Sequence, residues 1–183
     1  MCAGCGAVGS APALGAGGRW FEPSHPDQNF WFISCGYTKI ASQNMEIIRK
    51  NPDNLPTPLA AYSQVVKAGN IITTAGFIAT NQSGDLVGEE DIEKQTRQSI
   101  ENMIKALESV DSCLENVIKV TVYLSDMSFY KQMNTVYNEY FENIKPARAT
   151  VEGKLVLPSL LFEIDAIAVC WEIRFGSNIK LIK

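Results

Sequence analysis

Residues 118–152 read IKVTVYLSDMSFYKQMNTVYNEYFENIKPARATVE, and this stretch carries the clearest structural pattern in the chain. Ile118–Leu124 alternates apolar with polar side chains, which is the two-residue period of a half-buried strand. From Asp126, a residue suited to an N-cap, apolar and aromatic side chains recur at helical spacing as far as Asn143. The stretch therefore begins with a strand followed by a helix.

Proline ends this helix, because the residue before a proline is pushed out of helical geometry, and here Lys145 precedes Pro146. Ala147–Glu152 then has the composition of a strand, and Leu161–Val169 is the last strand, reached across Leu157-Pro158. The C-terminal half of the chain thus predicts a strand, a helix and two further strands.

The residues before this stretch extend the pattern towards the N-terminus. Short β-rich segments come first, separated by turn residues, and a long amphipathic segment follows. The expected elements are an edge strand from Met45, strands Ala61–Lys67 and Asn70–Ile78 joined by a turn at Ala68-Gly69-Asn70, a turn over Asn81–Asp85, and a helix over Ile92–Val110 capped by Asp91.

The resulting order is β-β-β-α-β-α-β-β, which indicates an α+β fold with two helices covering one face of a sheet. Val, Ile and Phe occur on both sides of several strands, so the other sheet face must be hidden as well. Packing against other copies of the chain is the simplest way to bury it, and we expect an oligomer.

Composition limits the function classes. Of 183 residues, 46% are hydrophobic and 20% charged, and the formal net charge is -4, which argues against binding nucleic acid. No apolar run is long enough to span a membrane, and the N-terminus lacks the basic region of a secretory signal, so we expect a cytoplasmic protein. Residues 1–44, rich in Gly, Pro and Ser, are interpreted as a disordered leader or extension, with organellar targeting as a weakly supported alternative.

Five scattered cysteines indicate free thiols rather than disulfides. Cys2 and Cys5 form a C-x-x-C pair, but no second pair lies at zinc-ribbon spacing, and the single histidine, His25, belongs to the same leader. We therefore expect no metal site. Motifs for phosphate binding, zinc hydrolysis or a Ser-His-Asp triad do not occur either.

Arg148 is the most informative polar residue inside the apolar strands. Its planar guanidinium matches the two oxygens of a carboxylate, so it could anchor a small carboxylic acid. The alternative is a structural ion pair with Glu163, Asp165 or Glu152, which the spacing alone slightly favours.

Three further residues could contribute chemistry. Glu163 could position or deprotonate a water, or instead pair with a basic residue at a subunit contact. Tyr62 could bind or stack on a substrate, although half-buried tyrosines are common. Asn134 lies on the predicted second helix and could equally be an ordinary polar face residue.

Taken together and in order, several segments resemble the RidA (YjgF) family. The resemblance covers residues 45–170 and leaves 171–183 as a tail. The matching segments are Ala61–Lys67 with Gly69-Asn70, Thr73–Gly76, Gln95–Ser99 with Glu101-Asn102, Val120–Leu124 with Asp126-Met127, Asn134 with Tyr137, Tyr140-Phe141, Pro146–Val151 and Glu163–Ala168.

The resemblance implies a chorismate-mutase-like fold with a mixed sheet, and a homotrimer with packed sheets and active sites between subunits. It implies hydrolysis of 2-imino or 2-enamino acids, such as 2-iminobutanoate and 2-iminopropanoate, to 2-keto acids and ammonia, without a cofactor. Arg148 would bind the substrate carboxylate and Glu163 would position the attacking water. The substrate-binding residues would be Tyr62, Gly76, Asn134 and Thr150.

Two departures from the family pattern bear on substrate preference. Ala75-Gly76-Phe77 stands where many members have Ser-Gly-Gln, and Thr150 replaces a common cysteine. Two other functions stay open: a non-catalytic, regulatory module that binds small carboxylates, and an endoribonuclease or translation inhibitor. The second would need a basic, aromatic surface, which the acidic composition disfavours.

Overall fold

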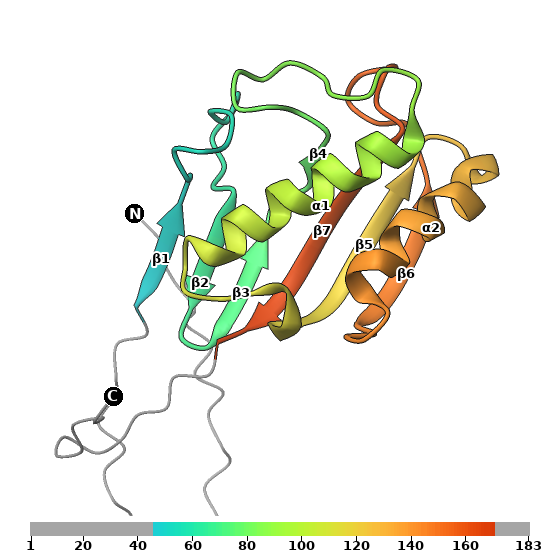
Figure 1. The fold of residues 1–183 in the computed structure, drawn as a ribbon. Coiled ribbons are helices and arrows are strands. Elements are labelled where there is room, and N and C mark those ends of the chain that lie inside the picture. Colours follow the sequence, from blue (N-terminus) through green and yellow to red (C-terminus); the bar gives the residue numbers. More distant parts are fainter. Residues whose placement is uncertain (1–45, 171–183) are drawn as a thin grey trace, which may run out of the picture. The chain divides into compact units, whose positions relative to one another are not determined.

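The computed structural model describes residues 46–170, and the expected leader and tail lie outside this range. The described residues form one mixed sheet in the order β1-β2-β3-β7-β5-β6, with the short β4 also paired to β7 (Figure 1). The elements are β1 (Ile47–Lys50), β2 (Val65–Ala68), β3 (Ile71–Thr74), β4 (Phe77–Ile78), α1 (Ile92–Glu108), β5 (Val117–Leu124), α2 (Tyr130–Phe141), β6 (Ala147–Glu152) and β7 (Phe162–Val169), with 3₁₀ turns at Leu114–Asn116 and Met127–Phe129.

β7 lies at the centre of the sheet, antiparallel to both β3 and β5, whereas β5 and β6 are parallel and connected through α2. Its side chains alternate between the two faces. Phe162, Ile164 and Ala166 are buried, while Glu163 and Asp165 point to the other face and are only partly buried. This alternation determines which β7 residues are available for chemistry.

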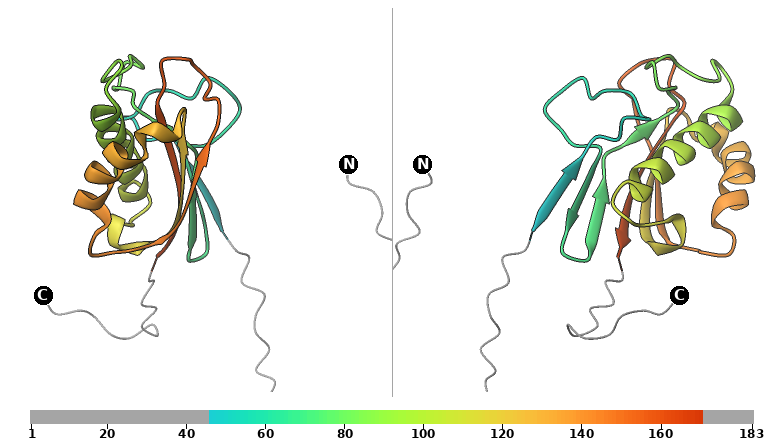
Figure 2. Two further views of the ribbon diagram at one scale, coloured as in Figure 1. Left: turned by 90° about the vertical axis from the view of Figure 1, so that its right-hand side faces the viewer. Right: turned by 60° about the vertical axis from the view of Figure 1, so that its left-hand side comes forward.

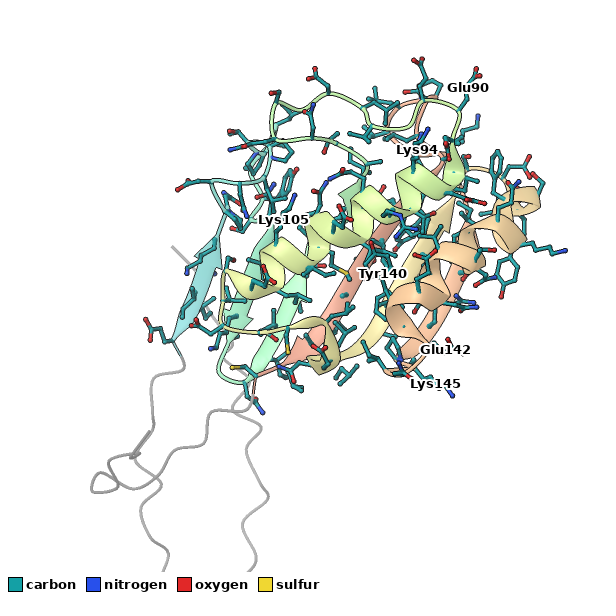
Figure 3. All side chains as sticks on the ribbon, viewed as in Figure 1. Glu90, Lys94, Lys105, Tyr140, Glu142 and Lys145 are labelled. Carbon is teal, nitrogen blue, oxygen red and sulfur yellow. The ribbon has the colours of Figure 1, made fainter. Side chains whose placement is uncertain are left out.

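Both helices cover the same face of the sheet, as Figures 1 and 2 show, and the predicted α+β class is confirmed. Asp91 caps α1 as expected, accepting a hydrogen bond from Lys94 N at 3.0 Å. Tyr140 on α2 lies between the helices (Figure 3), where it accepts a hydrogen bond from Arg97 and donates one to Glu101. These contacts fix the position of α2 along α1.

Gln95 on α1 is fully buried and fixes the segment that leads into β7. Its amide nitrogen donates to the carbonyls of Gly88 and Ser159, at 3.0 and 2.9 Å, and its amide oxygen accepts from Leu161 N at 2.8 Å. A buried amide with all of these bonds satisfied rigidifies its surroundings. The position of Glu163, two residues after Leu161, is therefore set by the helix layer.

The structure corrects two predicted strand boundaries. Residues 61–64 are not part of a strand, because Gln64 N donates to the side chain of Asn51 at 2.8 Å instead of joining the sheet. The predicted strand Asn70–Ile78 is broken at residues 75 and 76 into β3 and β4. The hairpin turn between β2 and β3 is confirmed, with Gly69 at a positive φ of 59°.

The predicted second helix is also divided. Asp126 caps the 3₁₀ turn Met127–Phe129 by accepting from Ser128 N at 2.7 Å, and α2 proper begins at Tyr130 and ends at Phe141, two residues before the expected end. Lys145 has a positive φ of 51° and leads directly into β6 at Ala147. The predicted bounds of β6, Ala147–Glu152, are correct.

The sheet face opposite the helices is partly apolar. Ile71 on β3 is 51% exposed and Ile167 on β7 is 37% exposed, and the register puts Thr73 opposite Ile167 on the same face. Large apolar side chains on a sheet face favour burial against another surface. The oligomer expected from the sequence stays a prediction.

The described residues contain free thiols but no cluster of metal ligands. Cys113 and Cys170 are free thiols, and the other three cysteines lie outside the described residues. Within residues 46–170, no group of three or more His, Cys, Asp or Glu side chains gathers as metal ligands. No helix in that range is long and apolar enough to cross a membrane.

Candidate active site

Arg148 lies on the edge strand β6 and points to the helix face, because it pairs with the buried Val120 of β5. Its guanidinium meets three side chains of α2. Nη1 donates to Asn134 Oδ1 at 2.7 Å, Nη2 donates to Tyr130 OH at 3.1 Å, and the guanidinium carbon lies 4.6 Å from the centre of the Tyr137 ring. Stacking on an aromatic face and two hydrogen bonds fix the plane of the guanidinium.

The partners of Arg148 are all neutral. Among the described residues it forms no ion pair: Glu152 instead accepts from Met127 N at 2.8 Å, and Glu163 and Asp165 point to the opposite face of the sheet. The structural ion pair considered from the sequence is therefore not formed within this part of the chain. No carboxylate of the described residues neutralises the positive charge of Arg148. A guanidinium has five N–H groups, and those not bonded to Asn134 or Tyr130 are available to a ligand.

Two hydroxyl groups accompany this cluster. Tyr137 OH and Thr150 Oγ1 are buried and have no hydrogen-bond partner within residues 46–170. Burial raises the pKa of Tyr137 to about 12, although the charge of Arg148 acts in the opposite direction. Tyr137 therefore stays protonated at neutral pH, and its hydroxyl is a donor that lacks an acceptor.

Glu163 belongs to a different environment. It pairs with Ile78 of β4 and Tyr123 of β5 on the sheet face away from the helices. Burial, and then the like charge of Asp165, raise the pKa of Glu163 above that of an ordinary glutamate. Its carboxylate forms no hydrogen bond or ion pair with another described residue.

Gly76 is the residue that the Glu163 carboxylate touches. A Cβ at position 76 would meet the carboxylate oxygen and lie 2.8 Å from Glu163 Cδ, so any larger residue would displace the side chain. Gly76 occupies the break between β3 and β4, where no ladder hydrogen bond constrains it. The absence of a side chain at Gly76 is thus what admits Glu163.

A cavity of about 430 Å³ adjoins this second cluster. Tyr62, 49% exposed, contributes to its wall together with Gly76. The lining comes from the loop before β2, from β4 with its flanking residues, from the turn after β4 and from α1: Pro56, Thr57, Leu59, Tyr62, Gln64, Gly76, Phe77, Ile78, Thr80, Gln82, Ser83, Gly84 and Asn102.

The predicted site residues therefore form two groups. One is the arginine cluster, defined as Arg148, Asn134 and Thr150 with Tyr130 and Tyr137. The other is the glutamate cluster, defined as Glu163, Gly76 and Tyr62. β5 separates β6 from β7, so their backbones are two strand spacings, about 10 Å, apart, and the two key side chains point to opposite faces. One chain does not bring them together.

Tyr130 and Tyr137 were not recognised as site residues from the sequence. Tyr130, Asn134 and Tyr137 lie at positions i, i+4 and i+7 of one helix, which is the spacing of a single helical face. The same spacing is typical of the apolar and aromatic stripe by which an ordinary helix packs on the core. The signal was present, but the pattern of α2 by itself does not show that an arginine of β6 faces these side chains.

Comparison with known proteins gives the family. A family model described as Endoribonuclease L-PSP matches residues 52–170. A RutC family protein from Pyrococcus horikoshii is 46% identical over 116 residues, which span 63% of this chain and 92% of the relative. The chain belongs to the RidA (YjgF) family. The resemblance inferred from the segments in order is confirmed.

Two further relatives of this RidA-family chain are informative. The 3-aminoacrylate deaminase RutC of Acinetobacter baylyi is 35% identical over 117 residues, covering 64% of this chain and 93% of the relative. The crystal structure of YyfA from Yersinia pestis, described as a Rid family protein of unknown function, superposes with a TM-score of 0.64 at 33% identity. It covers 68% of this chain and all of that one, so the RidA-family fold extends through the described residues.

Proposed function

We propose that this RidA-family protein hydrolyses reactive 2-imino and 2-enamino acids, such as 2-iminobutanoate and 2-iminopropanoate, to 2-keto acids and ammonia. The observation that carries the proposal is the guanidinium of Arg148, which is held by neutral partners and keeps N–H groups for a carboxylate. A relative that acts as a 3-aminoacrylate deaminase supports the same class of substrate.

Arg148 anchors the substrate through its carboxylate. A guanidinium binds both carboxylate oxygens with parallel hydrogen bonds, which fixes the orientation of the molecule as well as its position. Asn134 and Tyr130 hold the guanidinium from one side, and the unpaired hydroxyls of Thr150 and Tyr137 lie in the same cluster. The anchor is thus organised before the substrate arrives.

Glu163 serves as the base that positions water. The water oxygen bonds to the C=N carbon while one water proton passes to the Glu163 carboxylate, and Glu163 returns this proton to the imine nitrogen as the C=N double bond becomes a single bond. The carbinolamine so formed loses ammonia as its hydroxyl becomes the carbonyl. A raised pKa makes the Glu163 carboxylate a stronger base than an ordinary glutamate, which suits it for accepting a proton and returning it.

The two clusters act together only if they come from different chains. We infer a homotrimer in which the arginine cluster of one subunit faces the glutamate cluster of the next. The partly apolar open face, with Ile71 and Ile167, supports packing of the sheets against one another. Closed rotational symmetry then repeats the same site at each subunit contact.

The test is the release of ammonia and 2-keto acid when the protein is added to a dehydratase that generates 2-iminobutanoate or 2-iminopropanoate. Wild-type protein accelerates release, and Arg148→Ala abolishes the acceleration. No acceleration by folded wild-type protein would contradict the proposal for these two substrates.

Glu163→Gln separates the deaminase from a module that only binds carboxylates. Both functions need Arg148, but only catalysis needs an ionisable group at position 163. The deaminase predicts that Glu163→Gln loses turnover while it still binds the 2-keto acid product in calorimetry. Unchanged turnover in this variant would remove Glu163 from the mechanism.

A further inference from the structure

Lys67 of β2 is a buried lysine whose side chain reaches a thiol. Only 8% of the residue is exposed, although lysine is among the residue types least often buried. Its Nζ lies 3.4 Å from Sγ of Cys170, the residue that follows β7, and the two positions are 103 residues apart in the sequence. The fold therefore brings an amine and a thiol into direct contact.

The strand registers explain how these two side chains meet. Lys67 pairs with the buried Ile72 of β3, and Ile72 pairs with the buried Ala168 of β7. The three residues form one row across the sheet and point to the helix face. Side chains alternate along a strand, so Cys170, two residues beyond Ala168, returns to the same face. The chain is still held to the sheet there, because Cys170 N donates to Asn70 O at 2.9 Å.

The turn after α1 covers the sulfur atom from the helix layer. Cys170 Sγ lies 3.6 Å from Asp111 O, so the thiol donates to this carbonyl while it accepts from Nζ of Lys67. Asp111 has a positive φ of 60°, and its N–H donates to Glu108 O at 3.2 Å, which closes the turn on the end of α1. Cys170 packs against the core but stays partly exposed, so a small reagent can reach the sulfur.

Cys113 is the other thiol within residues 46–170 and differs from Cys170 in its neighbour. It is exposed, and its sulfur lies beside the carboxylate of Glu115 rather than beside an amine. Burial, and then the hydrogen bond with Glu115, raise the pKa of the Cys113 thiol. The thiolate is the reactive form of a cysteine, so a raised pKa makes Cys113 the less reactive kind of thiol.

We propose that Cys170 and Lys67 form a covalent sulfur–nitrogen bond when hydrogen peroxide oxidises the thiol, and that an added thiol reverses the bond. The bond ties β2 to the end of β7 across β3. Neither residue belongs to the arginine cluster or to the glutamate cluster, so this modification site is independent of the proposed deaminase function.

The reaction has two steps. In the first, the Cys170 sulfur loses its proton and attacks one oxygen of the peroxide, the O–O bond breaks, and the departing hydroxide takes up the proton, which gives a sulfenic acid and water. In the second, the neutral amine of Lys67 attacks the sulfur, the S–O bond breaks, and the hydroxyl leaves as water with a proton from the nitrogen. Sulfur is oxidised by two electrons and peroxide is reduced by two. Dithiothreitol returns two electrons and two protons, and becomes a cyclic disulfide.

Proximity decides the fate of the sulfenic acid. A sulfenic acid without a nearby partner is oxidised further to the sulfinic acid, which ordinary thiols do not reduce. Well-oriented intramolecular reactions have effective molarities of about 10⁵–10⁸ M, far above a millimolar concentration of peroxide. Because Nζ of Lys67 already lies 3.4 Å from the sulfur, the link forms before the second oxidation. It thereby keeps Cys170 in a form that can be reduced.

The test uses the full chain with Cys170 as the only thiol, the other four cysteines being replaced by serine: Cys2, Cys5, Cys35 and Cys113. Hydrogen peroxide is added to the folded protein, and intact mass and peptide maps are recorded. The expected product is about 2 Da lighter than the reduced chain and contains one cross-linked peptide pair that joins Cys170 to Lys67. Dithiothreitol restores the original mass. A disulfide between two chains differs from this product because it doubles the mass.

Lys67→Arg in this chain removes the amine and keeps the positive charge. Its expected product is the sulfinic acid, about 32 Da heavier than the reduced chain. Lys50→Arg is the matched control on the neighbouring strand β1, where Nζ of Lys50 donates to Ser109 O, and it still gives the lighter product. Unfolding the parent chain in urea before peroxide is added separates Lys67 from Cys170 and prevents the link.

The proposal is overturned when the folded parent chain gives no lighter product, whether or not the sulfenic-acid trap dimedone labels Cys170. Persistence of the lighter product in Lys67→Arg, or an equal yield from folded and urea-unfolded chains, also overturns it. Peptide maps of the parent chain identify the partner amine without any change at position 67. A cross-link from Cys170 to a different lysine therefore overturns the proposal even if Lys67→Arg does not fold.

Discussion

The arginine cluster and the glutamate cluster differ in how far one chain completes them. Arg148 is held by hydrogen bonds of 2.7 and 3.1 Å and by stacking on Tyr137, all within a single α2–β6 unit. Glu163 has no hydrogen-bond partner among the described residues, and burial and Asp165 raise its pKa. One group is fully positioned, and the other is a carboxylate with a raised pKa that is open on the sheet face.

Under the proposed mechanism, this contrast separates binding from catalysis. A guanidinium functions as an anchor only when its orientation is fixed. Neutral hydrogen-bond partners fix the orientation without neutralising the positive charge. A general base needs the opposite, a carboxylate free of strong donors that would lower its pKa. A single location cannot provide both environments, and the fold places them on two faces of the sheet.

Among the tests of the two clusters, mixing two inactive variants is expected to change the measured activity most. Arg148→Ala and Glu163→Gln each lose about a hundredfold or more of activity, since each removes a charged group from the site. In mixed oligomers a site regains both groups when each variant supplies its intact cluster. With random assembly this occurs at about a quarter of the sites, because each of two adjacent subunits has the required identity half of the time.

The mixture is prepared by co-expression with two different tags, and the doubly tagged oligomers are assayed. In a doubly tagged trimer about one site in three contains both groups, because the trimers made of a single variant are removed. Mixing Arg148→Ala with the double variant Arg148→Ala/Glu163→Gln is the control, because no site can then contain both groups. Doubly tagged oligomers of the first mixture without recovered activity would show that the two clusters do not combine across subunits.

Gly76→Ala tests the glutamate cluster alone. The new methyl group would overlap the Glu163 carboxylate and displace it, and a displacement of this order costs about ten- to a hundredfold in kcat. Gly153→Ala is the matched control, since a Cβ there meets nothing within 4 Å. Unchanged kcat in Gly76→Ala, with a melting temperature equal to that of Gly153→Ala, would mean that Glu163 does not act from its position beside Gly76.

The sequence predicted the scaffold better than the relation between the two clusters. The alternation in Ile118–Leu124 and the cap at Asp91 depend on neighbouring residues only, and both predictions were confirmed. The break at Ala75-Gly76 depends on contacts with residues distant in sequence: Gln64 N donates to Asn51 Oδ1 at 2.8 Å instead of continuing the β2–β3 ladder, and the Glu163 carboxylate lies against Gly76. Local periodicity continues through this position, so a single long strand was the natural and wrong prediction.

Strand order explains why the site was harder to predict than the fold. Arg148 and Glu163 are 15 residues apart, and the sequence allowed an ion pair between them. Their separation arises because β5 inserts between β6 and β7, and because the registers direct the two side chains to opposite faces. Neither the order of strands in the sheet nor the register follows from the period of any one strand. Tyr130 was missed for the same reason.

Asp165→Asn changes the pH profile rather than the maximal rate. Glu163 must be ionised to accept a proton, so kcat/KM falls as the pH drops through its pKa, and this acid limb lies above the pKa of an ordinary glutamate. Removal of the like charge at position 165 lowers the pKa of Glu163, and the limb moves to lower pH. Asp111→Asn changes the net charge equally outside both clusters and leaves the limb in place. An acid limb that stays put in Asp165→Asn would show that another group controls it.

Tyr130→Phe gives the smallest expected effect and tests the arginine cluster. It removes the hydrogen bond that Nη2 of Arg148 donates to Tyr130 OH while the ring remains. Tyr130 is 41% exposed, so water can replace the hydroxyl, and the loss is about 0.5–1.5 kcal/mol, equivalent to about two- to tenfold. Because Tyr130 acts through the anchor and not on the reacting carbon, KM rises by this factor and kcat is unchanged. The proton-accepting step at Glu163 is untouched, so the acid limb keeps its position. A fall in kcat at constant KM would contradict the division of labour between the clusters, because an effect of the arginine cluster would then appear in the chemical step.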